Sequence, residues 1–133
     1  MKGYLLDTNI CIFALRGEYG IVERMSQCGK GKCYISDVTI MELQFGAYNS
    51  GKIQENLTLI SNFLKKVKTV PFAKTIDTFC QEKIRLKKVG KPLEDYDLLI
   101  GCAAKVKGLI MVTDNVRHFD RIEGIAVENW VNR

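Results

Sequence analysis

The chain alternates short apolar segments with longer segments that carry apolar residues at helical spacing, and this order restricts its fold. The expected strands are residues 3–6, 33–35, 69–70, 109–113 and 125–127. The expected helices begin just after Asp7 and at residues 19–26, 36–48, 53–66, 73–89 and 95–106. Strands that alternate with helices favour a parallel sheet flanked by helices. Because 133 residues suit one domain, we predict a single α/β domain over residues 1–133 with a central, mostly parallel sheet.

The chain is basic, with 20 Lys and Arg against 15 Asp and Glu and a formal net charge of +5. A basic surface attracts polyanions, of which nucleic acid is the commonest. The basic residues gather in two groups, Lys65, Lys66 and Lys68, and Lys83, Arg85, Lys87, Lys88 and Lys91. Each group taken alone is better explained as a solvated helix face. Charge therefore favours a nucleic-acid partner without establishing one.

No apolar run approaches the roughly 20 residues that cross a bilayer, and Asp7 interrupts the first apolar segment too early for a signal peptide. We therefore expect a cytoplasmic protein without a membrane partner. The five cysteines agree, because an odd number cannot pair fully and disulfides are uncommon in the cytosol. Cys11, Cys80 and Cys102 lie in apolar helical stretches and are expected to be small core residues.

Two aspartates directly follow expected strands. Asp7 follows the strand at 3–6, and Asp114 follows the strand at 109–113. The carboxyl ends of parallel strands share one rim of the sheet, where α/β proteins carry their functional residues. We therefore expect both side chains to approach the same rim.

Glu42 lies on or beside the apolar stripe expected for its helix. That stripe consists of Val38, Met41, Phe45 and Tyr48. A carboxylate that faces inward is costly unless it is paired or binds a cation. A capping box begun by Thr39 would also explain Glu42, but Ser36 or Asp37 is a better start for this helix. Glu42 is therefore a candidate functional acid.

Asp97 opens a helix that is apolar almost all round, so its first turn is expected to face the interior or a cleft. A stabilising acid at a helix amino terminus is an equally good explanation of Asp97 alone. Several acids on one rim would repel one another and raise their pKa values, whereas a divalent cation removes the repulsion. Carboxylates and water suit Mg²⁺ or Mn²⁺. These residues therefore predict metal-dependent phosphodiester or phosphoryl chemistry.

Four motifs in register along essentially the whole chain resemble those of the PIN-domain family, and within it the VapC-type toxins of bacterial toxin–antitoxin pairs. They are Leu-Leu-Asp-Thr-Asn-Ile at 5–10, Ser-Asp-Val-Thr-Ile-Met-Glu-Leu at 36–43, the run from 90 to 100, and Val-Thr-Asp-Asn at 112–115 with Arg117 and Phe119. The ending Val-Glu-Asn-Trp at 127–130 is also similar to the usual one. Any one motif is weak evidence, but four in order are strong.

The resemblance implies a PIN fold and an endoribonuclease toxin that requires Mg²⁺, with Mn²⁺ as an alternative, and that inhibits translation by cutting structured tRNA or rRNA. It implies that Asp7, Glu42 and Asp97 are catalytic and bind the metal. The residues implied to support them by hydrogen bonding are Thr8, Asn9, Ser36, Thr39 and Thr113.

The last catalytic position stays open at this point. Asn115 has the family's usual spacing, Asp114 comes one residue early, and Asp120 is near. Asp114 and Asn115 are both kept as candidates. Glu94 stands where the family often has a small residue, so we expect an extra acid beside the site.

The resemblance also implies partners. A small cognate antitoxin of the VapB type would occupy the cleft and block it, often with a basic side chain among the acids. A homodimer or a toxin–antitoxin hetero-oligomer is expected.

Three other functions remain for comparison. A non-catalytic RNA-binding PIN module would be favoured by loss of Asp7, Glu42 or Asp97, and all three are present. A haloacid-dehalogenase-like phosphatase needs a second Asp two residues after the first, where this chain has Asn9. A metal-free ribonuclease with two catalytic histidines is excluded, because His118 is the single histidine, and it is expected to be a surface or turn residue.

Overall fold

The computed structural model describes residues 2–133 and contains a five-stranded sheet in the order β3-β2-β1-β4-β5, with every neighbouring pair parallel. The strands are β1 (Tyr4–Leu6), β2 (Cys33–Ser36), β3 (Lys68–Val70), β4 (Ile110–Val112) and β5 (Val127–Glu128). The predicted α/β class with a parallel sheet is confirmed. β1 lies at the centre of the sheet, so the residue that follows it stands in the middle of the rim.

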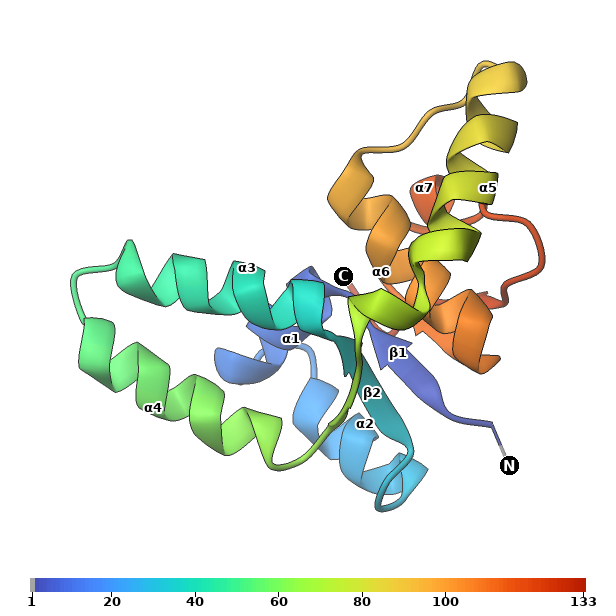
Figure 1. The fold of residues 1–133 in the computed structure, drawn as a ribbon. Helices are drawn as coiled ribbons and strands as arrows, with labels where there is room; N and C mark the ends of the chain where they lie inside the picture. Colours follow the sequence, from blue (N-terminus) through green and yellow to red (C-terminus); the bar gives the residue numbers. More distant parts are fainter. Residues whose placement is uncertain (1) are drawn as a thin grey trace.

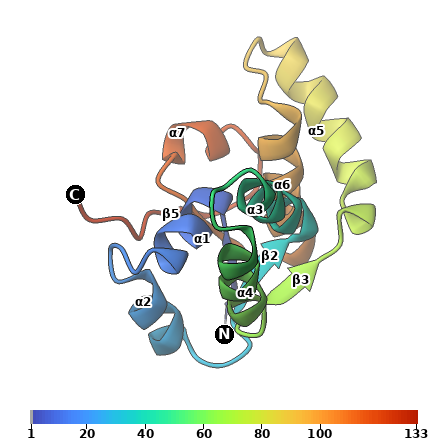
Figure 2. The same ribbon diagram turned by 90° about the vertical axis from the view of Figure 1, so that its left-hand side faces the viewer.

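Helices connect the strands and cover both faces of the sheet (Figures 1 and 2). They are α1 (Thr8–Leu15), α2 (Ile21–Cys28), α3 (Asp37–Tyr48), α4 (Ile53–Leu64), α5 (Ile76–Lys88), α6 (Asp95–Lys107) and α7 (Val116–Phe119), with a 3₁₀ turn, η1, at Phe72–Lys74. The expected helix at 73–89 is therefore divided. The hydroxyl of Thr75 donates to the carbonyl of Phe72 at 2.6 Å and closes the 3₁₀ turn before α5 begins.

The expected last strand at 125–127 is displaced. Pairing with β4 joins Met111 to Val127 and Val112 to Glu128, so β5 begins two residues later than its apolar pattern suggested. The strand is short, and the pairing partner rather than hydropathy sets its start.

Neighbouring residues of β1 enter different cores, because side chains alternate across a strand. Leu6 is buried with α1, α2, α3 and α4, whereas Leu5 is buried with α5, α6 and α7. Figure 2 shows α5 on the far side of the sheet from α1 and α2. With no solvated face, the central strands read as continuous apolar runs.

α3 begins as predicted, but its buried face differs from the prediction. The Ser36 hydroxyl accepts a hydrogen bond from the amide of Val38 at 3.1 Å, which makes Ser36 the amino-terminal cap. α3 and α4 form a hairpin that projects beyond the sheet (Figure 1) and packs through Leu43, Ala47, Ile60 and Phe63.

The prediction that the apolar stripe of α3 faces the core is therefore largely wrong. Met41, Phe45 and Tyr48 have exposed fractions of 46%, 70% and 63%. Only Val38 of that stripe is buried, because the rest of it lies on a side of the hairpin that α4 does not cover. Among the cysteines, Cys11 and Cys102 are buried as expected, but Cys80 is exposed, so its assignment to the core was wrong.

Gly101 lets α7 and the loop after it approach α6. A Cβ at this position would lie 2.1 Å from Cδ1 of Ile122 and 3.2 Å from Cδ1 of Phe119. All three residues are buried in the same core. The packing behind Asp97, which lies one turn earlier on α6, therefore depends on the absence of a side chain at 101.

We expect Gly101→Ala to destabilise the protein by about 1–3 kcal/mol, because overpacking of the core outweighs the gain of about 1 kcal/mol from replacing a helical glycine. Urea unfolding of the two proteins measures the difference. Gly46→Ala is a matched control, because Gly46 is in α3 and a Cβ there would meet nothing within 4 Å. The control should be neutral or stabilising, and a stabilising Gly101→Ala would contradict this description of the packing.

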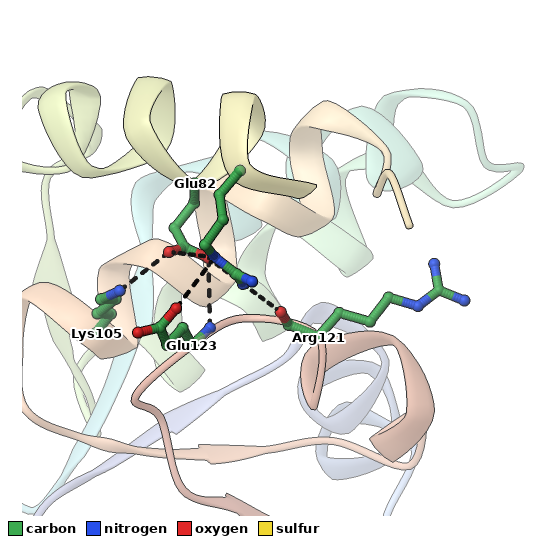
Figure 3. A network of polar contacts seen from close by, with 5 residues as sticks. Glu82, Lys105, Arg121 and Glu123 are labelled. Atoms are coloured by element: carbon green, nitrogen blue, oxygen red, sulfur yellow. Dashed lines mark hydrogen bonds and ion pairs between the residues drawn. The ribbon is translucent and has the colours of Figure 1, made fainter. Parts of the chain in front are cut away.

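Glu82 joins three elements through a buried ionic network (Figure 3). It has an exposed fraction of 4% and accepts hydrogen bonds from Arg85 Nη2 at 2.8 Å, Lys105 Nζ at 3.2 Å and the amide of Glu123 at 3.3 Å. Arg85 also donates to the carbonyl of Arg121 at 2.6 Å. Burial alone would raise the pKa of Glu82, but these donors lower it below its ordinary value. The network fastens α5 and α6 to the segment after α7.

We expect Glu82→Gln to reduce stability by about 1–3 kcal/mol, because it weakens charge-assisted hydrogen bonds from the half-buried Arg85 and Lys105. The lowered pKa means that the contribution of Glu82 is present above its ordinary pKa of 4.5 and is lost as pH falls through the lower, folded-state pKa. Denaturant unfolding at pH 7 and pH 3 should therefore show the two proteins converging in acid. Glu55→Gln is the control, because Glu55 is exposed and lies 4.0 Å from Lys52. An equal effect of both substitutions would exclude a special role for the network.

Candidate active site

Asp7 stands at the centre of the rim, between β1 and α1. Its amide donates to the carbonyl of Val112 at 2.9 Å, which continues the pairing of β1 with β4. Its carboxylate caps α1 by accepting from the amide of Thr8 at 2.8 Å. The other carboxylate oxygen accepts from the hydroxyl of Thr113 at 2.9 Å. With an exposed fraction of 6%, the Asp7 carboxylate is held in one orientation from two sides.

A short chain of hydrogen bonds connects Asn115, Thr113 and Asp7. The amide of Asn115 donates to the Thr113 hydroxyl at 2.9 Å, which leaves that hydroxyl proton free to point at Asp7. Thr113 is fully buried at the end of β4. The sequence therefore identified both members of this pair, and the fold brings them together from opposite ends of the chain.

Glu42 reaches the same region from α3. The hydroxyl of Thr8 donates to Oε1 of Glu42 at 2.6 Å and lies 3.0 Å from the hydroxyl of Thr39. Thr39 is fully buried, and Glu42 is half-buried. Thr8 thus contacts Asp7 through its amide and Glu42 through its hydroxyl, which couples the first and second motifs.

Asp7 has an unusual pKa for an aspartate. Burial raises the pKa to about 6 from its ordinary value of 3.8, although the hydrogen bonds from Thr113 and Thr8 oppose the increase. The charges of Asp97 and Glu42 raise the pKa further. Asp7 is therefore close enough to both Asp97 and Glu42 for their charges to disfavour its ionised form.

Asp97 lies in the first turn of α6 and is half-buried. Burial raises its pKa, the charge of Glu94 raises it further, and His118 lowers it. Glu94, which we expected beside the site, is therefore close enough to Asp97 to act on its carboxylate. His118 lies on α7, is half-buried and contacts the Asn115 side chain, so it is nearer to the acids than a simple surface residue would be.

Asp114, Asn115 and Asp120, the three candidates for the last catalytic position, have different surroundings. Asp114 accepts from Arg133 Nη2 at 2.8 Å, and its charge is already compensated there. The backbone amide of Asn115 donates to the Thr113 hydroxyl that binds Asp7, and its side chain contacts His118, whose charge lowers the pKa of Asp97. Asp120 is exposed and borders a concavity with Arg85, Lys91, Arg117 and Arg121. Of the three, Asn115 has the most direct connection to the acids.

The remaining predicted residues have smaller contributions. Ser36 is buried and caps α3, so it orients the helix that carries Glu42. Asn9 is exposed on α1 and lines a cavity of about 540 Å³ with Thr8, Ile12, Met41, Glu42, Phe45 and Tyr96. Aromatic and apolar groups of α3 and α6 therefore border Glu42. The sequence did not indicate this surface, because Met41 and Phe45 were expected to face the core and Tyr96 was not singled out.

The donor set suits a hard divalent cation. Across residues 2–133, no three Asp, Glu, His or Cys side chains stand close enough together to form a complete metal site as placed. Mg²⁺ needs fewer protein ligands, because it keeps several waters and is commonly held by one or two carboxylates. The buried carboxylate of Asp7, which the charge of the half-buried Asp97 destabilises, fits such an ion.

We expect Asp7→Asn to stabilise the metal-free protein at pH 8 by about 1–3 kcal/mol, because one pKa unit corresponds to about 1.4 kcal/mol. A raised pKa means that the favourable contribution of Asp7 is present below pH 3.8 and is lost as pH rises through about 6. Urea unfolding in EDTA at pH 4 and pH 8 should show the gain only at the higher pH. Asp77→Asn is the control, because Asp77 is exposed at the start of α5, and it should show no gain in stability at either pH. A variant less stable than wild type at pH 8 would contradict the raised pKa.

Comparison with known proteins agrees with this arrangement. The model of the PIN domain matches residues 4–125. The chain is 35% identical to the tRNA(fMet)-specific endonuclease VapC of Shigella flexneri over 131 residues, with 98% of this chain and 99% of that protein covered. It is 35% identical to ribonuclease VapC2 of Haemophilus influenzae over 133 residues, with 98% and 100% covered.

Solved structures show the same likeness in three dimensions. VapC-containing matches include a DNA-bound VapBC complex from Salmonella typhimurium, with a TM-score of 0.90, 33% identity and 98% and 99% of the two chains covered. A second, VapBC2 from Rickettsia felis bound to a promoter DNA fragment, has a TM-score of 0.87 at 28% identity, with 96% and 98% covered.

The fold, the acidic rim and the matched length define a PIN-domain protein. The chain belongs to the VapC ribonucleases of that family, the toxins of VapBC toxin–antitoxin systems. The resemblance stated from the motifs is confirmed. Within residues 2–133, the structure has no helix long and apolar enough to cross a membrane.

Proposed function

We propose that this VapC-type ribonuclease is a Mg²⁺-dependent endoribonuclease toxin that cuts structured RNA, tRNA or rRNA, in the cytoplasm and thereby inhibits translation. The observation that carries the proposal is the environment of Asp7, a buried carboxylate with a raised pKa that faces the charges of Asp97 and Glu42. Such an arrangement is unfavourable in the isolated protein and becomes favourable with a bound cation. The name of the Shigella flexneri relative, a tRNA(fMet)-specific endonuclease, supports tRNA as the first substrate to test.

Asp7 and Asp97 would hold the ion, with Glu42 beside them, and Mn²⁺ is the alternative to Mg²⁺. When bound, the ion would lower the pKa of a bound water and neutralise charge on the phosphate. Thr113 and the Thr8 amide favour the ionised form of Asp7 and orient its carboxylate, because both donate hydrogen bonds to it. Glu42 is positioned by Thr8 to accept a proton from the attacking water or to bind the metal.

Asn115 completes the set of polar groups in this proposal. Its amide holds Thr113, and its side chain contacts His118 next to Asp97. Asp114 is a weaker candidate because it is paired with Arg133. The full-length likeness to ribonucleases favours catalysis over a non-catalytic RNA-binding module and over a phosphatase.

We expect Asp7→Asn and Asp97→Asn each to reduce RNA cleavage at least about 100-fold, because even the hydrogen-bonding partners of metal ligands contribute 10–100-fold. Wild type and variants would be compared on total tRNA and rRNA with Mg²⁺ and with EDTA. Asp77→Asn is the matched control and should cleave like wild type. Cleavage that persists in EDTA, or in both active-site variants, would exclude this mechanism. If nothing cleaves while RNA binding is unchanged, the non-catalytic module is favoured.

A VapB-type antitoxin is the proposed partner, and the proposed assembly is a homodimer of this chain or a toxin–antitoxin hetero-oligomer. Solved relatives are VapBC complexes. Here the exposed side chains Met41, Phe45 and Tyr96 border the cavity that contains Glu42. Exposed apolar groups beside an acidic site suit an antitoxin segment that presents apolar residues and one basic residue.

We expect Phe45→Glu to weaken antitoxin binding at least about 10-fold, because it removes an apolar contact and introduces a charge into the cavity. The partner tested is the cognate VapB-type antitoxin, titrated against each toxin in the cleavage assay. Ile84→Glu is the matched control, because Ile84 is also an exposed apolar residue and lies on α5. Equal inhibition of wild type and Phe45→Glu would exclude this cavity as the antitoxin site.

A further inference from the structure

A second charged concavity lies at the other end of the sheet, by the starts of the strands. It has a volume of about 580 Å³ and is formed by the end of α2, the turn at 29–32, the start of β2 and the connection from α4 to β3. In Figure 1, α2 and the end of α4 lie together at this end, away from the tip of β1. Four of its lining residues are lysines, Lys30, Lys65, Lys66 and Lys68.

The fold, and not the sequence, brings these lysines together. Lys65, Lys66 and Lys68 are neighbours in the chain, but Lys30 comes from a turn more than thirty residues earlier. Gly31 has φ 77°, a conformation that favours glycine, and Lys68 Nζ lies 3.4 Å from where a Cβ at 31 would be. The turn is thus shaped to pack against Lys68.

Within residues 2–133, none of the four lysines forms an ion pair, and no acid lines the concavity. Other lysines of the chain do have acidic partners, namely Lys52 with Glu55, Lys83 with Asp95 and Lys105 with Glu82. Four cations in one hollow repel one another and attract an anion strongly. Lysine binds phosphate groups as a point charge.

We propose that this lysine pocket binds the phosphate backbone of the RNA substrate at a second position, distinct from the acidic rim. The proposal rests on the proposed ribonuclease function. Cys33 lines the pocket at the start of β2, and Ser36 ends that strand at the rim, beside α3. At about 3.3 Å per residue, β2 spans only roughly 10 Å between the pocket and the rim. A DNA duplex carries one negative charge about every 1.7 Å of its axis, and paired RNA is similarly dense in phosphate. A structured RNA bound at the rim therefore has several phosphates within the roughly 10 Å that separate the rim from the pocket.

The first test measures binding of labelled bulk tRNA by fluorescence anisotropy, in an Asp7→Asn background so that no RNA is cut. Lys65→Gln/Lys66→Gln should bind about 10-fold more weakly, and the slope of log K against log salt should fall by about 1.4–1.8, because each lost phosphate contact contributes about 0.7–0.9. Both lysines are exposed, and a thermal melt checks that the variant is folded. Lys74→Gln/Lys107→Gln, which removes two exposed lysines elsewhere, should bind like the parent.

A second readout uses cleavage by the otherwise wild-type protein. Lys65→Gln/Lys66→Gln should reduce kcat/KM on tRNA about 10-fold but leave a short oligonucleotide that reaches only the rim unaffected. Equal losses in binding for the two double variants, or equal losses on long and short RNA, would overturn the proposal. If the wild type cuts no RNA but Lys65→Gln/Lys66→Gln still binds RNA more weakly than its parent, the ribonuclease proposal fails and RNA binding by the lysine pocket is supported.

Two other ligands are distinguished in the same experiments. Duplex DNA of matched sequence that binds as tightly as RNA, with the same loss in Lys65→Gln/Lys66→Gln, would overturn the assignment to RNA. In a separate experiment, inorganic phosphate alone is added to the protein, and backbone amide chemical shifts are followed by NMR. Shifts around residues 29–32 and 65–68, together with unchanged RNA binding in the double variant, would assign the pocket to free phosphate instead.

Discussion

The hydrogen bonds of Asp7 are the constraint on which the rest of the site depends. Its carboxylate caps α1 through the Thr8 amide and accepts from Thr113 at the end of β4, while its own amide continues the β1–β4 ladder. One side chain therefore joins the central strand, its neighbour and the first helix. Because Thr8 also holds Glu42, the orientation of α3 relative to the rim follows from the same contacts.

This arrangement has an energetic cost that fits its use. A carboxylate with an exposed fraction of 6%, near two others, is stable in its charged form only with compensation. Two hydrogen bonds supply part of the compensation, and the raised pKa shows that they do not supply all of it. By contrast, Glu82 is as deeply buried but is surrounded by Arg85 and Lys105, so its pKa is lowered and it serves stability (Figure 3). Two buried acids in one small domain thus differ because of the charges that face them.

The molecule also has two chemically different surfaces, one beside the acidic rim and one at the other end of the sheet. Beside Glu42, the exposed apolar side chains of α3 and Tyr96 suit a protein partner. At the opposite end of the sheet, four lysines that form no ion pair with any residue from 2 to 133 suit a polyanion. The projection of the α3–α4 hairpin beyond the sheet explains the first surface, because none of the elements described between residues 2 and 133 covers the face that carries Met41, Phe45 and Tyr48.

The sequence by itself determined the α/β class, the order of strands and helices, and the candidacy of Asp7, Glu42 and Asp97, because hydrophobic periodicity and position after a strand are local properties. It could not determine which apolar residues are buried, since α3 shows the same stripe whether or not a neighbour covers it. Only the tertiary structure decided that Phe45 is exposed, that Gly101 is needed where Ile122 crosses α6, and that Thr113 meets Asp7 across 106 positions of the chain. It also decided that Lys30 joins Lys65, Lys66 and Lys68. Contacts between distant residues depend on how the layers pack, and no local pattern specifies that packing.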